Sequence, residues 1–430
     1  MRIVKVNLIV LLLMHYSLAF GASKVIDGGA GTDSLVINYS GITSLKDFTL
    51  SSYSSGELSY IKAVDNGENV IAFTRINSLT VNSISYSFAP STAINSGDGG
   101  LSNAFYSTNQ KTIHSYGSTV WYAQNICEGD HSLGFNCSDD IEYIGSAYDE
   151  TLNLNMSVRD NMGYTFVLTI DLKDGNDSIN SAKLINTDSI DLGAGDDTIS
   201  LMFGADAGGY QTIQNANISK LDGGSGTDTL SFGESANPPS SISLTTAGAT
   251  NFENLTGTTS AETLNGDANA NILIGNSGAD TLNGNGGNDT LWAQSASLTP
   301  ASTGASGTDS DDNLYGGAGN DILYASAGDN ILDGGTGADT IYSGTGSDVI
   351  VIRSGDGGSS ISDADTLADV SNGVDLIGLS NLQYSDLTVE QGTGSYSSHA
   401  VVKKTDTGEF LLIIHNQSIG NIDDSDFSAI

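Results

Sequence analysis

The chain has 430 residues, with 14 Lys and Arg against 51 Asp and Glu, so its formal net charge is −37. Such an acidic chain is excluded as a binder of nucleic acid or anionic lipid, because phosphate recognition needs a basic surface. The 53 Gly and only 4 Pro, together with many Ser, Thr, Asn and Asp, predict short strands and turns rather than helices.

The first residues have the pattern of an export signal. Arg2 and Lys5 precede an apolar run at 8–13, and small residues follow it. The run is too short for a transmembrane helix. We predict that residues 1–22 are a secretory signal peptide. The mature protein is then expected to be secreted or held at the cell surface, with no membrane insertion after signal removal.

A β-rich N-terminal region is predicted over residues 23–140, because apolar and polar residues alternate along much of it. It contains one repeat-like unit with Asp33 and the only two cysteines, Cys127 and Cys137. In an oxidising compartment we predict a disulfide between them. A zinc site that adds His131 is the alternative, although the spacing matches no common zinc motif.

Turns rich in Gly and Asp recur at irregular intervals over residues 141–235. The clearest are LGAGDDTIS at 192–200 and GGSGTDTLS at 223–231, and each follows a strand-like run. We interpret this region as an irregular β-solenoid with degenerate repeats. A connector is predicted at 236–256.

A regular nine-residue repeat fills residues 257–352. Its clearest copies are GGAGNDILY and GGTGADTIY, which begin at Gly316 and Gly334. Position eight is always aliphatic, so positions seven to nine predict a short strand with only its middle residue pointing inward. Two units would make one coil, so residues eighteen apart, such as Asp321 and Asp339, are expected to stack.

The sixth position of the repeat is usually a carboxylate, and stacked carboxylates repel one another. A cation between them offsets the repulsion, and oxygen ligands from carboxylates and turn carbonyls suit Ca²⁺ better than Zn²⁺ or Mg²⁺. Asn271 and Asn330 keep an oxygen but lose the charge, so weaker or empty sites are predicted there. A loop insertion near 293–311, which contains Pro300, is expected to interrupt the row.

The pattern G-G-x-G-x-D-x-U-x resembles the RTX (repeats-in-toxin) family of secreted calcium-binding proteins with hemolysin-type repeats. The resemblance implies an all-β fold: a parallel β-roll or β-solenoid that binds several Ca²⁺, with a β-rich N-terminal region and a β-rich C-terminal cap. The predicted Ca²⁺ ligands are Glu262, Asp280, Asp289, Asp312, Asp321, Asp339 and Asp348. The predicted turn backbone for Ca²⁺ is Gly275, Gly278, Gly284, Gly287, Gly316, Gly317, Gly319, Gly334, Gly335, Gly337 and Gly346. Further ligands are predicted at Asp33, Asp177, Asp197 and Asp228.

Residues 353–430 are predicted to form a C-terminal cap. The segment from Asp365 to Leu379 resembles the C-terminal segment of RTX proteins, with Val370 where the family usually has Phe. In that family this end also serves type I secretion. The export route is therefore left open between this segment and the N-terminal signal.

No catalytic motif is visible, since the chain contains neither H-E-x-x-H nor G-x-S-x-G. We predict a non-enzymatic protein that folds on Ca²⁺ binding and has a structural or adhesive role at the cell surface or in extracellular matrix. Cell-surface glycans and self-association are the expected partners besides calcium. Two alternatives stay open. One is a hydrolase or other enzyme with an unrecognised N-terminal active site. The other is a glycan- or ice-binding adhesin that uses outward columns of Thr and of aromatic residues, and the aromatic column includes Tyr324 and Tyr342.

Overall fold

In the computed structural model the chain is built from short strands, and its described residues contain no α-helix. The chain divides into unit 1, Met1–Asp228 with Ala247–Asn251, and unit 2, Thr229–Thr246 with Phe252–Ile430. The predicted all-β fold is confirmed. The structure describes residues 6–12, 23–27, 32–38, 42–55, 58–65, 70–76, 78–88, 104–107, 112–116, 120–122, 140–154, 167–182, 184–202, 204–205, 211–212, 218–233, 240–295, 310–370 and 374–430.

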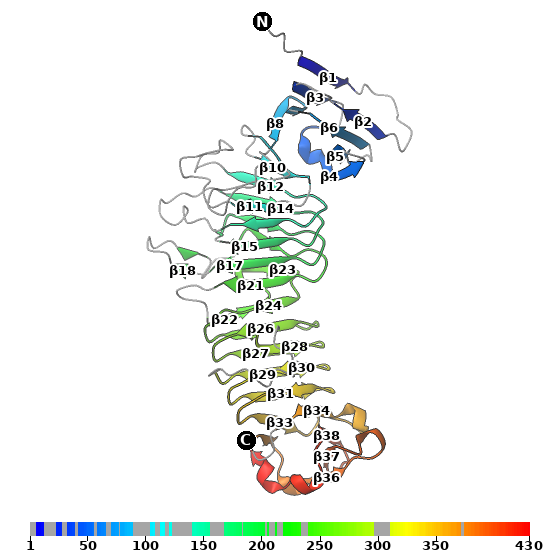
Figure 1. The fold of residues 1–430 in the computed structure, drawn as a ribbon. Coiled ribbons are helices and arrows are strands. Elements are labelled where there is room, and N and C mark those ends of the chain that lie inside the picture. The colour runs from blue at the N-terminus through cyan, green and yellow to red at the C-terminus, as the bar shows by residue number, and fades with distance from the viewer. Residues whose placement is uncertain are drawn as a thin grey trace. The chain divides into compact units, whose positions relative to one another are not determined.

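Unit 1 begins with mixed sheets and continues as parallel coils (Figure 1). Its strands are β1 (Val6–Leu12), β2 (Ser23–Asp27), β3 (Thr32–Asn38), β4 (Phe48–Ser55), β5 (Leu58–Asp65), β6 (Val70–Thr74), β7 (Ser78–Val81), β8 (Ile84–Phe88), β9 (Ala104–Ser107), β10 (Thr112–Ser115), β11 (Val120–Tyr122), β12 (Ile141–Ile144), β13 (Thr151–Asn153), β14 (Leu168–Asp171), β15 (Ser178–Ala182), β16 (Ser189–Asp191), β17 (Thr198–Met202), β18 (Gly204–Ala205), β19 (Gln211–Thr212), β20 (Lys220–Asp222) and β23 (Ala249–Thr250).

The N-terminal part of unit 1 has its own hydrophobic core. Strands β4, β5 and β6 are antiparallel, and β3 pairs in parallel with β7. Leu35, Phe73, Leu79 and Phe105 are buried together, and the Leu45 N–H donates to the Tyr86 hydroxyl at 3.1 Å. Strand β1, within the predicted signal peptide, pairs in parallel with β3. The signal peptide itself stays a prediction.

From β10 onward, unit 1 is a solenoid of parallel rungs. Strands β10, β12, β14, β16, β20 and β23 follow one another in one sheet, and β11, β13, β15 and β17 in another. The chain alternates between the two sheets, so each coil contributes one short strand to each.

Unit 2 contains the regular coils and a C-terminal group of strands. Its strands are β21 (Thr229–Gly233), β22 (Ser241–Ser243), β24 (Asn254–Thr256), β25 (Thr263–Asn265), β26 (Ile272–Asn276), β27 (Thr281–Gly286), β28 (Thr290–Gln294), β29 (Asn313–Ala318), β30 (Ile322–Tyr324), β31 (Ile331–Thr336), β32 (Thr340–Tyr342), β33 (Val349–Arg353), β34 (Asp365–Asp369), β35 (Leu376–Ser380), β36 (Leu387–Gln391), β37 (Ala400–Lys404), β38 (Phe410–Ile414) and β39 (Phe427–Ala429). The short 3-10 helices of the whole chain are η1 (Leu45–Asp47), η3 (Thr246–Gly248), η4 (Ile361–Asp363), η5 (Tyr384–Asp386), η6 (Gly394–Tyr396), η7 (Ile419–Asn421) and η8 (Asp424–Asp426).

The regular coils of unit 2 have the register that the nine-residue period predicts. Ile322 pairs with Thr340 and Asn313 with Ile331, each eighteen residues on. The aliphatic residue at position eight is completely buried in every unit, and each such burial contributes roughly 2 kcal/mol. This inward column consists of Leu264, Leu273, Leu282, Leu291, Leu314, Leu323, Leu332, Ile341 and Ile350.

The insertion near 293–311 does not interrupt the roll, contrary to the expectation from its sequence. Residues 296–309 lie outside the described residues. On either side of them, Thr281 pairs with Asn313 and Thr290 with Ile322, in the same parallel register as elsewhere. The coil that carries the insertion keeps its rungs, because the inward residues Leu291 before it and Leu314 after it are both completely buried.

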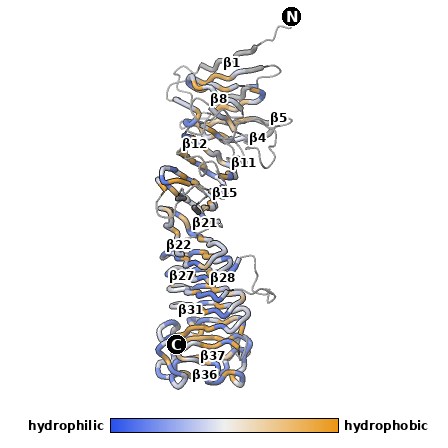
Figure 2. Tube along the Cα trace, turned by 90° about the vertical axis from the view of Figure 1, so that its left-hand side faces the viewer, coloured by the Kyte–Doolittle hydropathy of each residue, from blue (hydrophilic) through white to orange (hydrophobic). Residues whose placement is uncertain are grey.

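The last rungs of unit 2 are continued by the C-terminal strands. β38 pairs in parallel with β34, and β37 and β36 extend the same sheet in antiparallel fashion. Val401, Val402, Leu411 and Leu412 are buried there, and Figure 2 shows the apolar stretch beside β37. β38 thus gives the last rung of this sheet a partner, as expected for a cap. The domain boundaries predicted from the sequence stay predictions.

Candidate metal sites in the turn rows

The turns between rungs have a fixed backbone pattern. In the units that begin at Gly275, Gly284, Gly316, Ala325, Gly334 and Ser343, positions two and four have positive φ, as in Gly317 (109°) and Gly319 (139°). Position two tolerates Asn276 and Ser326, whereas the values above 120° at position four occur only at Gly. A Cβ on Gly337 would fall within bonding distance of the carbonyl oxygen of the preceding coil, so position four has to be Gly wherever the turn takes this φ.

Position six forms two hydrogen-bonded rows along unit 2. Within each row, the backbone N–H of one residue donates to the side-chain Oδ1 of the residue one coil further on, at 2.7–3.2 Å. The buried N–H groups at the rung starts are therefore satisfied by side chains. Row A contains Asn271, Asp289, Asp321, Asp339 and Asp365. Row B contains Glu262, Asp280, Asp312, Asn330, Asp348 and Asp375.

The second carboxylate oxygen of several row residues has no hydrogen-bond partner within the protein. Oδ2 of Asp289, Asp321, Asp339 and Asp348 is buried and unpartnered, and each of these residues is only 1 % exposed. An uncompensated buried charge is strongly destabilising. None of the ion pairs in the described part of the chain involves these four residues. The rows therefore require a cation or a proton from outside.

The pKa values of the row carboxyls reflect this cost. Burial raises the pKa of Asp289 and of Asp348 to about 7, and that of Asp339 to about 6. A pKa raised above the unfolded value of 3.8 stabilises the metal-free fold fully below pH 3.8, and this contribution is lost as pH rises through the folded pKa. Near neutral pH the metal-free rows consequently approach their least stable, ionised form.

Asn330 shows what the corner beside position six can bind. Its amide Nδ2 donates to the Gly328 carbonyl at 3.0 Å, while its Oδ1 accepts the Asp312 N–H at 2.9 Å. In coils that have Asp at position six, a carboxylate oxygen takes the place of the Asn amide donor. The space beside position six is then lined by oxygen acceptors only. No three His, Cys, Asp or Glu side chains converge on one point in the described residues, so turn carbonyls must complete any ligand set. Such an all-oxygen set fits Ca²⁺.

The repeat region matches a known protein family. A family model described as the RTX calcium-binding nonapeptide repeat (4 copies) matches residues 187–207, 256–291, 306–341, 315–350 and 324–357. These segments of the chain carry RTX repeats. The RTX repeats make the chain a calcium-binding β-roll protein.

Other comparisons add little to this assignment. No curated protein matches the RTX chain. Among solved structures, it is similar to the extracellular lipase LipA from Serratia marcescens, with 14 % identity and a TM-score of 0.16. The alignment covers 72 % of the RTX chain and 42 % of the lipase chain, so the chain spans less than half of the lipase's length. No helix in the described part of the RTX chain is long and apolar enough to cross a membrane.

A third row, row C, lies in unit 1, mostly outside the segments that match the RTX model. It consists of Glu150, Asp177, Asp197 and Asp228. Each backbone N–H again donates to the next Oδ1, at 2.6, 2.6 and 2.8 Å. The intervals of 27, 20 and 31 residues are irregular, so the coils of unit 1 contain different numbers of residues.

A second set of rows runs along position five, with the opposite polarity. The Asn320 N–H donates to Asn288 Oδ1 at 2.9 Å, and the Asp329 N–H donates to Asp311 Oδ1 at 2.8 Å. These side chains are exposed or half-buried and satisfy backbone N–H groups of the following coil. Sequence reasoning missed these rows, although the recurring Asn or Asp before position six was a usable signal.

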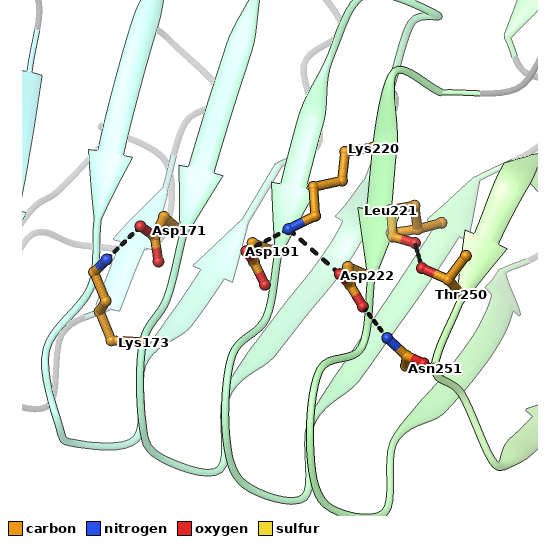
Figure 3. Close-up of polar contacts among 8 residues, drawn as sticks. All are labelled: Asp171, Lys173, Asp191, Lys220, Leu221, Asp222, Thr250 and Asn251. Carbon is orange, nitrogen blue, oxygen red and sulfur yellow. Dashed lines mark hydrogen bonds and ion pairs between the residues drawn. The ribbon is translucent and has the colours of Figure 1, made fainter.

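Lysines neutralise a different set of stacked carboxylates in unit 1 (Figure 3). Asp171, Asp191 and Asp222 lie in register on β14, β16 and β20. The Lys220 ammonium pairs with both Asp191 and Asp222, and Lys173 pairs with Asp171. Here a lysine side chain supplies the positive charge that the rows of unpartnered carboxylates do not have.

Replacing Lys220 by Gln is expected to lower the free energy of unfolding by no more than about 1 kcal/mol, because exposed ion pairs are screened by water. The loss should disappear near 1 M salt, where screening is nearly complete. Urea unfolding at low and high salt measures both. A loss of unfolding free energy that is several times larger and insensitive to salt would contradict the view that Lys220 makes only exposed ion pairs.

The predicted aromatic column is present on unit 2. Trp292 stacks on Tyr324 with ring centroids 3.8 Å apart, and Tyr324 stacks on Tyr342 at 4.8 Å. Stacking between neighbours covers the ring faces that a sugar would need. The geometry therefore favours a packing role over a glycan platform.

Replacing Tyr324 by Leu should accordingly cost about 1 kcal/mol or somewhat more of unfolding free energy, because two stacked contacts are lost. Denaturant unfolding in saturating Ca²⁺ measures this cost. Unchanged stability together with lost binding to a glycan or to ice would instead favour the adhesin alternative.

The structure places most of the predicted site residues in the rows. The predicted ligands of the repeat lie in rows A and B, and Asp177, Asp197 and Asp228 lie in row C. Asp33 is in β3 opposite Asn7, and its side chain is outside the described part. Cys127 and Cys137 also lie outside it, so the disulfide stays a prediction.

Three row residues were not predicted as ligands. Asp365 and Asp375 extend rows A and B beyond the last repeat, and Glu150 begins row C. Asp365 follows Asp339 by 26 residues and Asp375 follows Asp348 by 27, so the period of eighteen does not find them. The signal that was available is a carboxylate directly before an apolar strand.

Proposed function

We propose that this RTX protein is a secreted, calcium-folded scaffold with a structural or adhesive role at the cell surface or in extracellular matrix. The observation that carries the proposal is the set of buried, unpartnered Asp oxygens in rows A and B. Outside the cell, Ca²⁺ is abundant enough to neutralise them. The strong net negative charge supports the same view, because self-repulsion would keep the chain unfolded where calcium is scarce.

We propose Asp280, Asp289, Asp312, Asp321, Asp339 and Asp348 as the carboxylate ligands, with Asp365 and Asp375 added at the row ends. The turn carbonyls of the Gly-rich positions complete the sites. Glu262 is the weakest member of the set, because both of its carboxylate oxygens already accept hydrogen bonds from Thr258. At Asn330 the amide supplies its own donors, so we expect no ion bound through that side chain.

Different residues of the roll have different roles in calcium-dependent folding. The position-six carboxylates and turn carbonyls would hold a Ca²⁺, whose positive charge would offset the buried carboxylate charge. Oδ1 of each Asp fixes the register of neighbouring coils by accepting a backbone N–H, and Gly at position four lets the turns approach. The inward Leu column then buries apolar surface only once the turns are stacked. Folding and ion binding are therefore coupled.

Cell fractionation tests the biological role. Washed cells of a producing strain should retain the protein on their surface or matrix, and a calcium chelator should release it. Recovery only from the cytoplasm would contradict the export part of the proposal. A hydrolytic activity of the purified, calcium-loaded protein would instead favour the enzyme alternative.

A further inference from the structure

The first coils of the roll, residues 254–276, satisfy their buried side-chain polar groups without a metal ion. They contain β24, β25 and β26, whose inward residues Leu255, Leu264 and Leu273 are completely buried. In the described part of the chain, none of the buried side-chain N and O atoms without a hydrogen-bond partner belongs to these coils. The later coils differ, since the buried Oδ2 of Asp289 has no such partner.

Asn271 stands at position six in row A and uses both ends of its amide. Its Nδ2 donates to the Glu253 carbonyl of the preceding coil at 2.9 Å, and its Oδ1 accepts the Asp267 N–H at 2.8 Å. Glu262, the row B residue of these coils, is satisfied by Thr258 through both of its oxygens. The two position-six residues of the first coils therefore leave no unpaired oxygen for a cation to neutralise.

Position two carries a second set of amide donors in this part of the roll. Asn276 has a φ of 78°, and its Nδ2 donates to the Gly257 carbonyl at 2.8 Å. Asn285 has a φ of 74°, and its Nδ2 donates to the Gly266 carbonyl at 3.0 Å. Each accepting carbonyl belongs to position one of the preceding coil. Three later units have Gly at position two, which has no side chain to donate: Gly317, Gly335 and Gly344.

The amide contacts give the first coils a stability that does not depend on an ion. The stability of a solenoid is approximately a sum over its coils and their interfaces, so one coil can stay folded while another does not. The later coils bury carboxylate oxygens that destabilise the fold when they are ionised and uncompensated. A folded first coil also offers the next rungs a register, in which Leu264 pairs with Leu282 and Ile274 with Trp292.

We propose that residues 254–276 are a calcium-independent seed, which stays folded in chelator and on which the calcium-dependent coils assemble when Ca²⁺ is added. The amides of Asn271 and Asn276 hold the turns of the seed together. This proposal rests on the proposed function in one respect, because it takes the later coils to need Ca²⁺. It adds that the roll grows from a preformed end.

Hydrogen exchange followed by mass spectrometry on the full-length protein tests the seed. In excess chelator, the backbone amides of residues 254–276 should exchange on the order of tenfold more slowly, or slower still, than those of residues 313–350. Saturating Ca²⁺ should slow exchange strongly in residues 313–350 and much less in the seed. Fast exchange of both segments in chelator would overturn the seed and leave the calcium-folded scaffold standing.

Asn271→Asp is the sharpest variant, because it replaces the amide donor by a carboxylate oxygen of the same shape. The Glu253 carbonyl loses its donor, so the seed should exchange on the order of tenfold faster in chelator. Saturating Ca²⁺ should restore the protection, because the later coils carry Asp at this position. A variant that simply failed to fold would not be rescued in this way. Asn276→Asp should also lose protection in chelator, since it removes the donor to Gly257.

Asn269→Asp is the matched control. It adds the same charge to the same coil, at an exposed side chain whose amide donates to Asp267 only two residues away, at 2.9 Å. Exchange of the seed in chelator should change by no more than about threefold. If Asn271→Asp behaved like Asn269→Asp, the proposal would be wrong. This comparison decides the matter even if residues 313–350 proved to be protected in chelator, a result that would count against the function proposed for the roll.

The rate of calcium-triggered folding tests the growth of the roll from the seed. Trp292 lies on β28, which pairs with β26 of the seed, so its fluorescence in a Trp121→Phe chain reports on the first coil to be added. After Ca²⁺ is mixed with the chelated protein, this signal should appear several times more slowly in Asn271→Asp than in Asn269→Asp. Equal rates in the two variants would overturn the templating role of the seed.

Discussion

Replacing Asp339 by Ala is expected to raise the Ca²⁺ midpoint for folding of the roll on the order of tenfold or more, because a central carboxylate of row A is lost. The substitution has a second cost. The buried Asp321 N–H loses its acceptor at 2.7 Å, which destabilises by roughly 1–3 kcal/mol even with calcium present. Circular dichroism during Ca²⁺ titration gives the midpoint, and urea unfolding in saturating Ca²⁺ gives the second cost.

Asp339→Asn is the matched control for this prediction. Asn keeps the Oδ1 acceptor for Asp321, and its amide provides a donor for the turn carbonyls, as Asn330 does at 3.0 Å. We expect the Asn variant to be more stable in chelator than both the parent and the Ala variant, while it binds less Ca²⁺. If the Asn and Ala variants behaved alike in chelator, the role given to the unpartnered oxygen would be wrong.

Replacing Gly319 by Ala is expected to cost about 4 kcal/mol or more, at the upper end for single substitutions. Two effects add. The φ of 139° is strained for any L side chain, and the new Cβ would overlap the Gly287 carbonyl of the preceding coil. Because that carbonyl belongs to the proposed ligand set, Ca²⁺ affinity should fall as well. Denaturant unfolding and Ca²⁺ titration measure the two effects.

Two other glycines separate these effects. Gly286 lies in the same roll with a conventional φ, and the nearest atoms to an added Cβ are 3.7 and 3.8 Å away, so Gly286→Ala should change stability by less than about 1 kcal/mol. Gly355 has a φ of 101° but open space around it, so Gly355→Ala should cost only about 1–2 kcal/mol of backbone strain. A Gly319→Ala variant as mild as Gly355→Ala would refute the steric account.

The period of nine predicted much of unit 2 because two local requirements recur with it. An inward Leu, such as Leu323, needs the same place in every rung, and a turn as tight as that at Gly319 needs Gly. Together they fix the strand length and the register of eighteen that pairs Ile322 with Thr340. The parallel β-roll therefore follows from the sequence alone.

What the period could not predict depends on contacts between coils of unequal length. Glu150, Asp365 and Asp375 join rows across intervals of 26 or 27 residues, and only the fold brings them into line. The donor role of the Asn330 amide was also missed, since Asn was read only as a weakened Asp. The expected interruption at the insertion was wrong, because a loop can leave a turn without shifting the rungs on either side.

A Ca²⁺ titration of the chelated, full-length protein followed by far-UV circular dichroism tests the central claim most directly. It is best made at about pH 8, above the pKa of about 6 to 7 of Asp289, Asp339 and Asp348, and repeated with Mg²⁺ in place of Ca²⁺. We expect the strand signal to be largely lost in chelator, to return cooperatively with Ca²⁺, and to return poorly with Mg²⁺. A complete strand signal in excess chelator that Ca²⁺ leaves unchanged would contradict a roll folded by calcium.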